Sequence, residues 1–157
     1  MTKLDLKGNP FIQLVDEMAR LQGRVTSLFD QVHEESGLKS MEEIVLTAIF
    51  EADTPPTVPQ IGRSLGHPRQ VIQRAVNDLA DEGFIERLTN PDHKRAPLLA
   101  VTTKGEKLKQ RTDAIALSIA ERFLQHVNSA TCTELAIELR AVRKALEAFS
   151  REQGETK

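Results

Sequence analysis

The most constraining feature of this chain is a sharp break in a helical stretch, at the sequence Leu-Gly-His-Pro of residues 65–68. Thr57 and Gln60 have the spacing of a capping box, which predicts that a short helix begins there. Gly66 is suited to the left-handed conformation that ends a helix, and Pro68 to the start of the next one. Only two or three residues therefore separate two helices, which is the spacing that a helix-turn-helix needs.

The second of these helices is expected to run from Pro68 to Gly83, with one apolar and one polar face. The apolar positions recur at helical spacing: Ile72, Ala75, Val76 and Leu79. The opposite face is predicted to bind DNA through Pro68, Arg69, Gln70, Gln73, Arg74 and Asn77. Arg presents donors that fit guanine, and Gln presents a donor and an acceptor that fit adenine. The alternative is a solvated helix face, because Arg and Gln are also good helix formers.

A β-hairpin is expected after this helix, with strands at residues 84–88 and 98–102 around a turn-rich loop. Lys94 and Arg95 at its tip are predicted to bind DNA, because the minor groove and its phosphates attract cations. His93 would add charge at low pH. The alternative is a surface turn kept soluble by its cations. Ser64 and Thr57 are candidates for phosphate contacts that orient the protein without reading sequence.

The charge distribution favours the DNA-binding interpretation of this central stretch. Residues 58–111 hold 10 basic and 6 acidic residues, whereas residues 1–57 hold 5 and 10 and residues 112–157 hold 6 and 7. The whole chain has a net charge of −2, so its positive charge is gathered where phosphate would be met.

Helices with apolar seams flank the central stretch. One seam predicts a single helix of about six turns and comprises Phe11, Leu14, Met18, Leu21, Val25, Leu28 and Val32. A second seam comprises Leu135, Leu139, Val142, Leu146 and Phe149. We predict dimerisation helices in residues 1–35 and 104–157, around a DNA-binding domain at 40–103. The alternative is that these helices pack only on their own domain.

Three more capping boxes predict helix starts, at Ser40/Glu43, Thr103/Glu106 and Thr131/Glu134. The predicted fold is mainly α with a small β-hairpin wing, namely a winged helix-turn-helix plus N- and C-terminal dimerisation helices.

This order of elements resembles the MarR family of bacterial transcription regulators over essentially the whole chain, with motif-level similarity at about residues 57–106. The matching positions are Leu65-Gly66, Arg74, Leu79, Gly83-Phe84-Ile85, Glu86-Arg87, Asn90-Pro91, Arg95-Ala96, Thr102 and Lys104-Gly105. The resemblance implies a homodimer on a pseudo-palindromic double-stranded DNA site, with a small-molecule effector between the dimer region and the DNA-binding lobe.

The wing departs from the family pattern. His93 stands where the family has an Asp that anchors the wing arginines, and Lys94 stands for the first of those arginines. Asp92 is the candidate substitute for the missing anchor.

Neither an enzyme nor a cofactor is expected. The histidines His33, His67, His93 and His126 lack ligand spacing, and a metal site joining His33 and His126 across a dimer is a remote alternative. Cys132 at a helix start is a small buried filler or, alternatively, a redox sensor.

A soluble, cytoplasmic protein without a membrane partner is predicted, because no signal peptide or spanning segment is visible. The second functional hypothesis is a winged-helix adaptor that binds protein and has little affinity for DNA.

Overall fold

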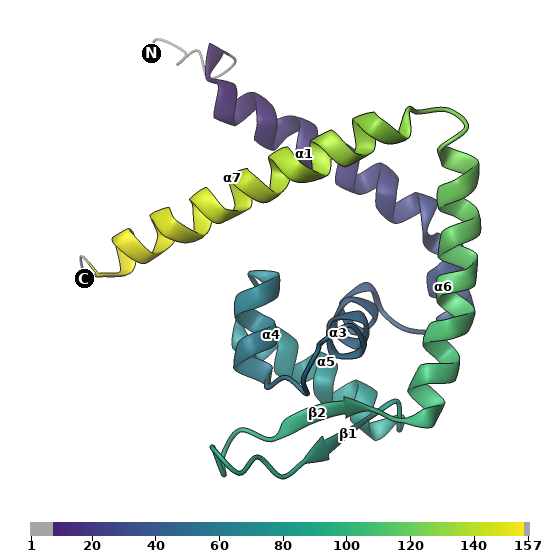
Figure 1. Ribbon diagram of the computed structural model, residues 1–157, viewed down its shortest axis with the longest axis vertical. Helices are drawn as coiled ribbons and strands as arrows, with labels where there is room; N and C mark the ends of the chain where they lie inside the picture. Colours follow the sequence, from purple (N-terminus) through teal and green to yellow (C-terminus); the bar gives the residue numbers. More distant parts are fainter. Residues whose placement is uncertain (1–7, 156–157) are drawn as a thin grey trace, which may run out of the picture. The chain divides into compact units, whose positions relative to one another are not determined.

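The computed structural model describes residues 8–155. Seven helices and two strands follow one another within them: α1 (Pro10–Leu28), α2 (Asp30–Ser36), α3 (Ser40–Phe50), α4 (Val58–Leu65), α5 (Arg69–Asp81), β1 (Ile85–Leu88), β2 (Leu98–Val101), α6 (Thr103–Phe123) and α7 (Ser129–Glu155). This order confirms the predicted mainly α fold with a hairpin wing (Figure 1). The chain forms two compact units, and the first ends at Ala116 within α6.

The core of the first unit lies among α3, α4, α5 and the hairpin. Its fully buried side chains come from three of these elements and are Val45, Ile72, Val76, Leu79 and Leu99. α3 contacts both α5 and β2, so α5 and the hairpin are held by one common helix. Leu108 at the beginning of α6 joins the same core. The predicted inward face of α5 is therefore confirmed.

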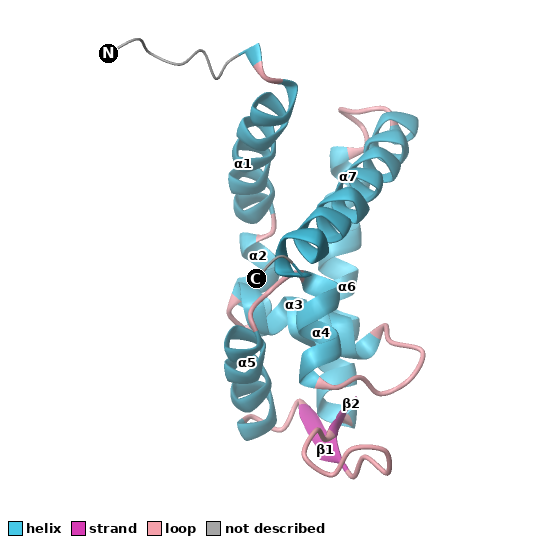
Figure 2. Ribbon diagram, turned by 90° about the vertical axis from the view of Figure 1, so that its left-hand side faces the viewer, coloured by secondary structure: helices cyan, strands magenta, loops and turns pink. Residues whose placement is uncertain are grey.

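The hairpin is a two-stranded antiparallel sheet that pairs Ile85 with Val101 and Leu88 with Leu98. Its long loop extends beyond the ends of the strands (Figure 2). Gly105 fixes the way in which α6 leaves this sheet, because a Cβ atom there would lie 2.1 Å from the carbonyl oxygen of Phe84. No side chain fits in that space, so this glycine is required for the close approach.

The predicted single N-terminal helix is wrong at one point. α1 ends at Leu28, and Phe29, with φ −98° and ψ 11°, separates it from α2. Only Val32, beyond the break, is buried, whereas α1 has no buried residue.

The predicted capping box of α4 is confirmed, and in it the Thr57 backbone N–H donates to Oε1 of Gln60 over 2.7 Å. The other three boxes are wrong by one to three residues. The structure places the caps of α3, α6 and α7 earlier, at Lys39, Thr102 and Asn128.

Each displacement has a physical reason. Glu42 Oε2 accepts from the Lys39 backbone N–H over 2.9 Å, while Glu43 turns to His33. Thr102 caps α6 because its hydroxyl also donates to the Gly83 carbonyl over 2.7 Å, which Thr103 does not. Asn128 displaces Thr131 because an Asn side chain is a stronger cap than a Thr side chain.

Candidate nucleic-acid interface

The turn between α4 and α5 is built by two glycines. Gly66 has the left-handed φ of 69° that ends α4, as predicted. Gly62 is buried where the returning chain crosses α4, and a Cβ atom there would lie 3.1 Å from the carbonyl oxygen of His67. This close crossing gives α5 its fixed direction from α4.

α5 presents a polar face to solvent. Arg69, Gln70, Arg74 and Asn77 are exposed, and Gln73 is half-buried. Pro68 precedes the helix as its N-cap residue instead of forming its first turn. An ion pair of 3.3 Å between Lys39 Nζ and Asp78 Oδ2 ties this helix to the start of α3. Hydrogen bonds to Glu42 and Asp78 raise the pKa of Lys39 above its usual 10.5, so the tie stays charged.

Asn90 holds the wing loop together. Its Nδ2 donates to the Ala96 carbonyl over 2.7 Å, and its Oδ1 accepts from the Asp92 backbone N–H over 3.0 Å. The Asn90 side chain is buried in the loop although the tip around it is exposed. Among the described residues, the Asp92 carboxylate has no ion-pair partner, so the suggestion that Asp92 replaces the family's anchor is wrong.

The cations of this surface carry uncompensated charge. Within residues 8–153 there are five cations on this surface that form no ion pair, although ion pairs form on α1, α3, α6 and α7: Arg63, Arg69, Arg74, Lys94 and Arg95. A groove between α4 and the wing is lined by Arg63, Arg69, His93 and Arg95, and by one carboxylate, that of Asp92. Three guanidinium groups in one groove outnumber its single carboxylate, which pairs with none of them, so the local potential is positive and attracts phosphate.

A second polar cluster joins α5 to β1. Asn77 Oδ1 accepts from Arg87 Nη2 over 2.8 Å and from Gln73 Nε2 over 3.1 Å. Arg87 lies two residues after the buried Ile85, and alternate residues of a strand share a face. Arg87 therefore points toward α5 from the sheet.

The predicted site residues divide into two clusters. Arg69 and Arg95 share the groove beside the wing, while Gln73 and Asn77 belong to the hydrogen-bonded cluster on α5. Gln70, Arg74 and Lys94 are exposed outside both. Ser64 shares a different groove, with Glu51 and Asp53, and the Thr57 hydroxyl donates to Gln60.

Two cations were missed from the sequence. Arg63 could have been predicted from the polar face of α4, because it is four residues from Pro59 and both line the groove. Arg87 could have been predicted from the alternation of side chains along β1, which places it on the same face as Ile85.

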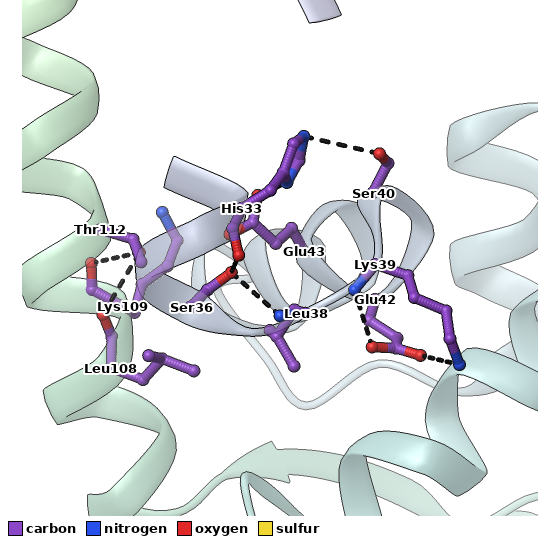
Figure 3. Close-up of polar contacts among 10 residues, drawn as sticks. All are labelled: His33, Ser36, Leu38, Lys39, Ser40, Glu42, Glu43, Leu108, Lys109 and Thr112. Atoms are coloured by element: carbon purple, nitrogen blue, oxygen red, sulfur yellow. Dashed lines mark hydrogen bonds and ion pairs between the residues drawn. The ribbon is translucent and has the colours of Figure 1, made fainter. Parts of the chain in front are cut away.

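A cavity of about 410 Å³ lies inside the first unit, lined by the end of α1 and by α2, α3 and α6. Most of its lining is apolar, and its ionisable residues are His33, Glu43, Lys109 and Asp113. Lys109 Nζ pairs with Asp113, while Lys109 itself is 7% exposed. Figure 3 shows Lys109 with Leu108 and Thr112 on α6, next to the α2–α3 turn.

His33 Nδ1 lies 2.7 Å from Glu43 Oε2 without the geometry of a hydrogen bond, so the contact is an ion pair only when His33 is protonated.

Residues 8–155 contain no group of three or more His, Cys, Asp or Glu side chains placed to hold a metal ion. Cys132 is half-buried near the start of α7. No helix in this part of the chain is long and apolar enough to cross a membrane.

Comparison with known proteins finds a matching family model and a relative of similar length. A model of the MarR family matches residues 36–96. An uncharacterised protein of Mycobacterium tuberculosis is 33% identical over 138 residues, which cover 85% of this chain and 96% of the relative.

Solved structures share the fold. A MarR-family transcriptional regulator from Rhodococcus sp. RHA1 superposes with a TM-score of 0.75 at 18% identity, covering 86% of this chain and 95% of that one. The transcriptional repressor CouR, bound to a 23-mer DNA duplex, gives a TM-score of 0.73 at 20% identity, with coverages of 91% and 98%. CouR from Rhodococcus jostii RHA1 bound to p-coumaroyl-CoA gives 0.72 at 18% identity, with coverages of 89% and 95%.

Proposed function

The chain belongs to the MarR family, and from this membership we propose that it is a transcriptional regulator that binds a pseudo-palindromic DNA operator as a homodimer. The observation that carries the proposal is the set of unpaired cations on α5 and the wing. Cations left without carboxylate partners remain available for phosphate and for base edges.

The predicted cations and glutamines each have a role in this proposal. Arg69 and Arg74 offer bidentate donors to guanine, and Gln70 and Gln73 offer a donor and an acceptor to adenine. Lys94 and Arg95 reach the minor groove or its phosphates from the wing, as positions on a hairpin tip permit. Arg63 adds a phosphate contact beside them, which positions the protein without reading sequence. A DNA complex of CouR, which has the same fold, supports this use of the surface.

The homodimer is supported by apolar side chains that a single chain leaves in water. On α1 these are Phe11, Ile12, Val15, Met18, Leu21, Val25 and Leu28, each 40–55% exposed. On α7, Leu135 and Phe149 are 56% and 57% exposed. Contiguous apolar surface of this extent is typical of an interface. We therefore assign residues 1–35 and 104–157 to pairing and residues 40–103 to DNA.

The cavity beside Lys109 is proposed to take a small organic anion as effector. Its volume of about 410 Å³ lies in the range of small-molecule sites. An apolar lining suits the body of such a ligand, and the buried Lys109 ammonium suits its anionic group. The complex of CouR with p-coumaroyl-CoA supports an effector role for a MarR fold.

The proposal is tested by titrating the protein with random-sequence duplex DNA at increasing salt. Affinity is expected to fall by about 10³-fold or more between 50 and 200 mM salt, because bound phosphates release counterions. On the duplex selected from a random pool, Arg74→Ala is expected to cost about 1–3 kcal/mol. Lys144→Ala, which removes a cation from α7, is the control and should change little.

Absence of binding in dilute buffer would overturn the DNA-binding proposal. It would favour the adaptor instead, in which the same exposed face of α5 binds a protein.

A further inference from the structure

The hydrogen bonds around Asn77 permit only one assignment of donors and acceptors. Arg87 Nη2 and Gln73 Nε2 both lie within hydrogen-bond distance of the same atom, Asn77 Oδ1, at 2.8 Å and 3.1 Å. A guanidinium group only donates, so Arg87 requires Asn77 to present its oxygen. An amide oxygen only accepts, so Asn77 in turn requires Gln73 to present its NH₂ group.

This assignment determines which atoms of the Gln73 amide remain available for another hydrogen bond. One N–H of its NH₂ group is used by Asn77, while the other N–H and Oε1 remain free for an outside partner. A neighbouring N–H donor and carbonyl acceptor match N7 and the N6 amino group of adenine. If the Gln73 amide were turned by 180°, its carbonyl would meet Asn77 and its free atoms would no longer make this pair.

We propose that Arg87 is a positioning residue that, through Asn77, orients the Gln73 amide and so makes the protein prefer adenine at the base contacted by Gln73. The proposal rests on the DNA-binding function proposed above and specifies one element of its sequence preference. It also changes the role of Asn77, which becomes the support of a base-reading side chain instead of a base-reading residue itself.

The position of Arg87 in the fold supports this role. The strand β1 packs against α5. Side chains alternate between the two faces of β1, and Arg87 lies on the face that meets α5. It reaches the helix at Asn77, two turns after Arg69. The side chains of Asn77 and Arg87 are exposed, so without these hydrogen bonds to Asn77 Oδ1 the amides of Asn77 and Gln73 could each turn by 180°.

The experiment begins with the duplex that the wild-type protein selects from a random pool. The base pair contacted by Gln73 is the one at which Gln73→Ala removes discrimination, and affinities for all four bases are then compared there. Wild-type protein is expected to prefer adenine by about tenfold or more, as a bidentate contact allows. Arg87→Met and Asn77→Leu are expected to reduce this preference to about threefold or less, because the Gln73 amide is no longer fixed.

Two variants separate orientation from charge. Asn77→Asp keeps an acceptor for both donors, so it is expected to retain the adenine preference although repulsion of phosphate weakens binding to every duplex. Arg63→Met removes an exposed guanidinium group elsewhere on the surface, and it is expected to weaken all duplexes evenly with the preference unchanged.

The outcomes that overturn the inference are distinct from those that overturn the proposed function. If Arg87→Met behaves like Arg63→Met, Arg87 is only a phosphate contact and the inference is wrong. The same follows if Asn77→Asp loses the preference as Asn77→Leu does, or if the preferred base is not adenine. If wild-type protein binds no duplex even in dilute buffer, the DNA-binding function fails and the inference fails with it.

Discussion

Lys109 shows how a single residue departs from what folding alone would favour. Among residues 8–153 it is the only lysine or arginine that is buried, and its carboxylate partner Asp113 is half-exposed. The ring of Phe50 lies 5.8 Å from its ammonium nitrogen. Burying such a pair costs hydration energy that the mutual attraction repays only partly, so an apolar residue would serve the fold as well. We therefore associate Lys109 with ligand binding.

At this residue we predict that Lys109→Met changes the free energy of unfolding by less than about 1 kcal/mol, since Met fills the space and Asp113 is still reached by water. The variant should lose the rise in Tm that benzoate, a simple aromatic anion, is expected to cause in the wild type. Thermal unfolding with and without benzoate measures both. Lys107→Met, on the exposed side of the same helix, is the control and should respond as the wild type does. A retained response in Lys109→Met would remove Lys109 from the ligand site.

At the scale of elements, the wing is stabilised from within its own loop. Replacing Asn90 by Ala removes two hydrogen bonds inside a loop that has no other described side-chain support, at a cost of about 1–3 kcal/mol. We predict faster hydrogen exchange of the backbone amide of Ala96, which donates to the His93 carbonyl, and weaker DNA binding, because Lys94 and Arg95 lose their fixed placement.

Asp92→Ala is the matched control for the wing. Its carboxylate has no ion-pair partner within residues 8–153, so hydrogen exchange should stay close to that of the wild type, and DNA binding should not weaken, because a negative charge is removed from the groove. Equal loosening in both variants would show that the Asp92 carboxylate supports the loop as much as Asn90 does.

The elements also show which parts of the fold and site are predictable from sequence. The helices, the turn at Gly66 and both strands follow from local signals, namely apolar period and glycine position. The breaks and caps do not, because neighbouring residues compete for the same role: Thr102 wins over Thr103 through a bond to a strand end distant in sequence. The polar face of α5 was predictable from its period. Its hydrogen bonds to Arg87 required knowing that β1 packs against it.

At the scale of the whole molecule, α1 and α7 carry exposed apolar faces, which we propose to be the pairing surfaces of the homodimer. A two-fold dimer brings the same face from both chains together, so one substitution in a seam acts twice at the interface. On α7 the seam residues Leu139 and Leu146 fall on one side of the helix, and Ala148 falls on the opposite side.

We predict that Leu139→Asp converts the protein from two chains to one chain of 17.5 kDa, as measured by light scattering. Two carboxylates facing each other across an apolar interface lack the hydration that they have in water. Ala148→Asp introduces the same charge outside the seam and should leave the mass at two chains. An unchanged mass in Leu139→Asp would place the interface elsewhere.

The monomeric variant also separates pairing from DNA contact. Its α5 and wing are unaltered, so binding to random duplex should keep a salt dependence, with a slope reduced to about half because one lobe contacts half the phosphates. Affinity for the selected pseudo-palindromic duplex should fall much further than affinity for random DNA, because two linked half-sites act as one bivalent contact. An equal loss on both duplexes would mean that the substitution had damaged the DNA-binding lobe itself.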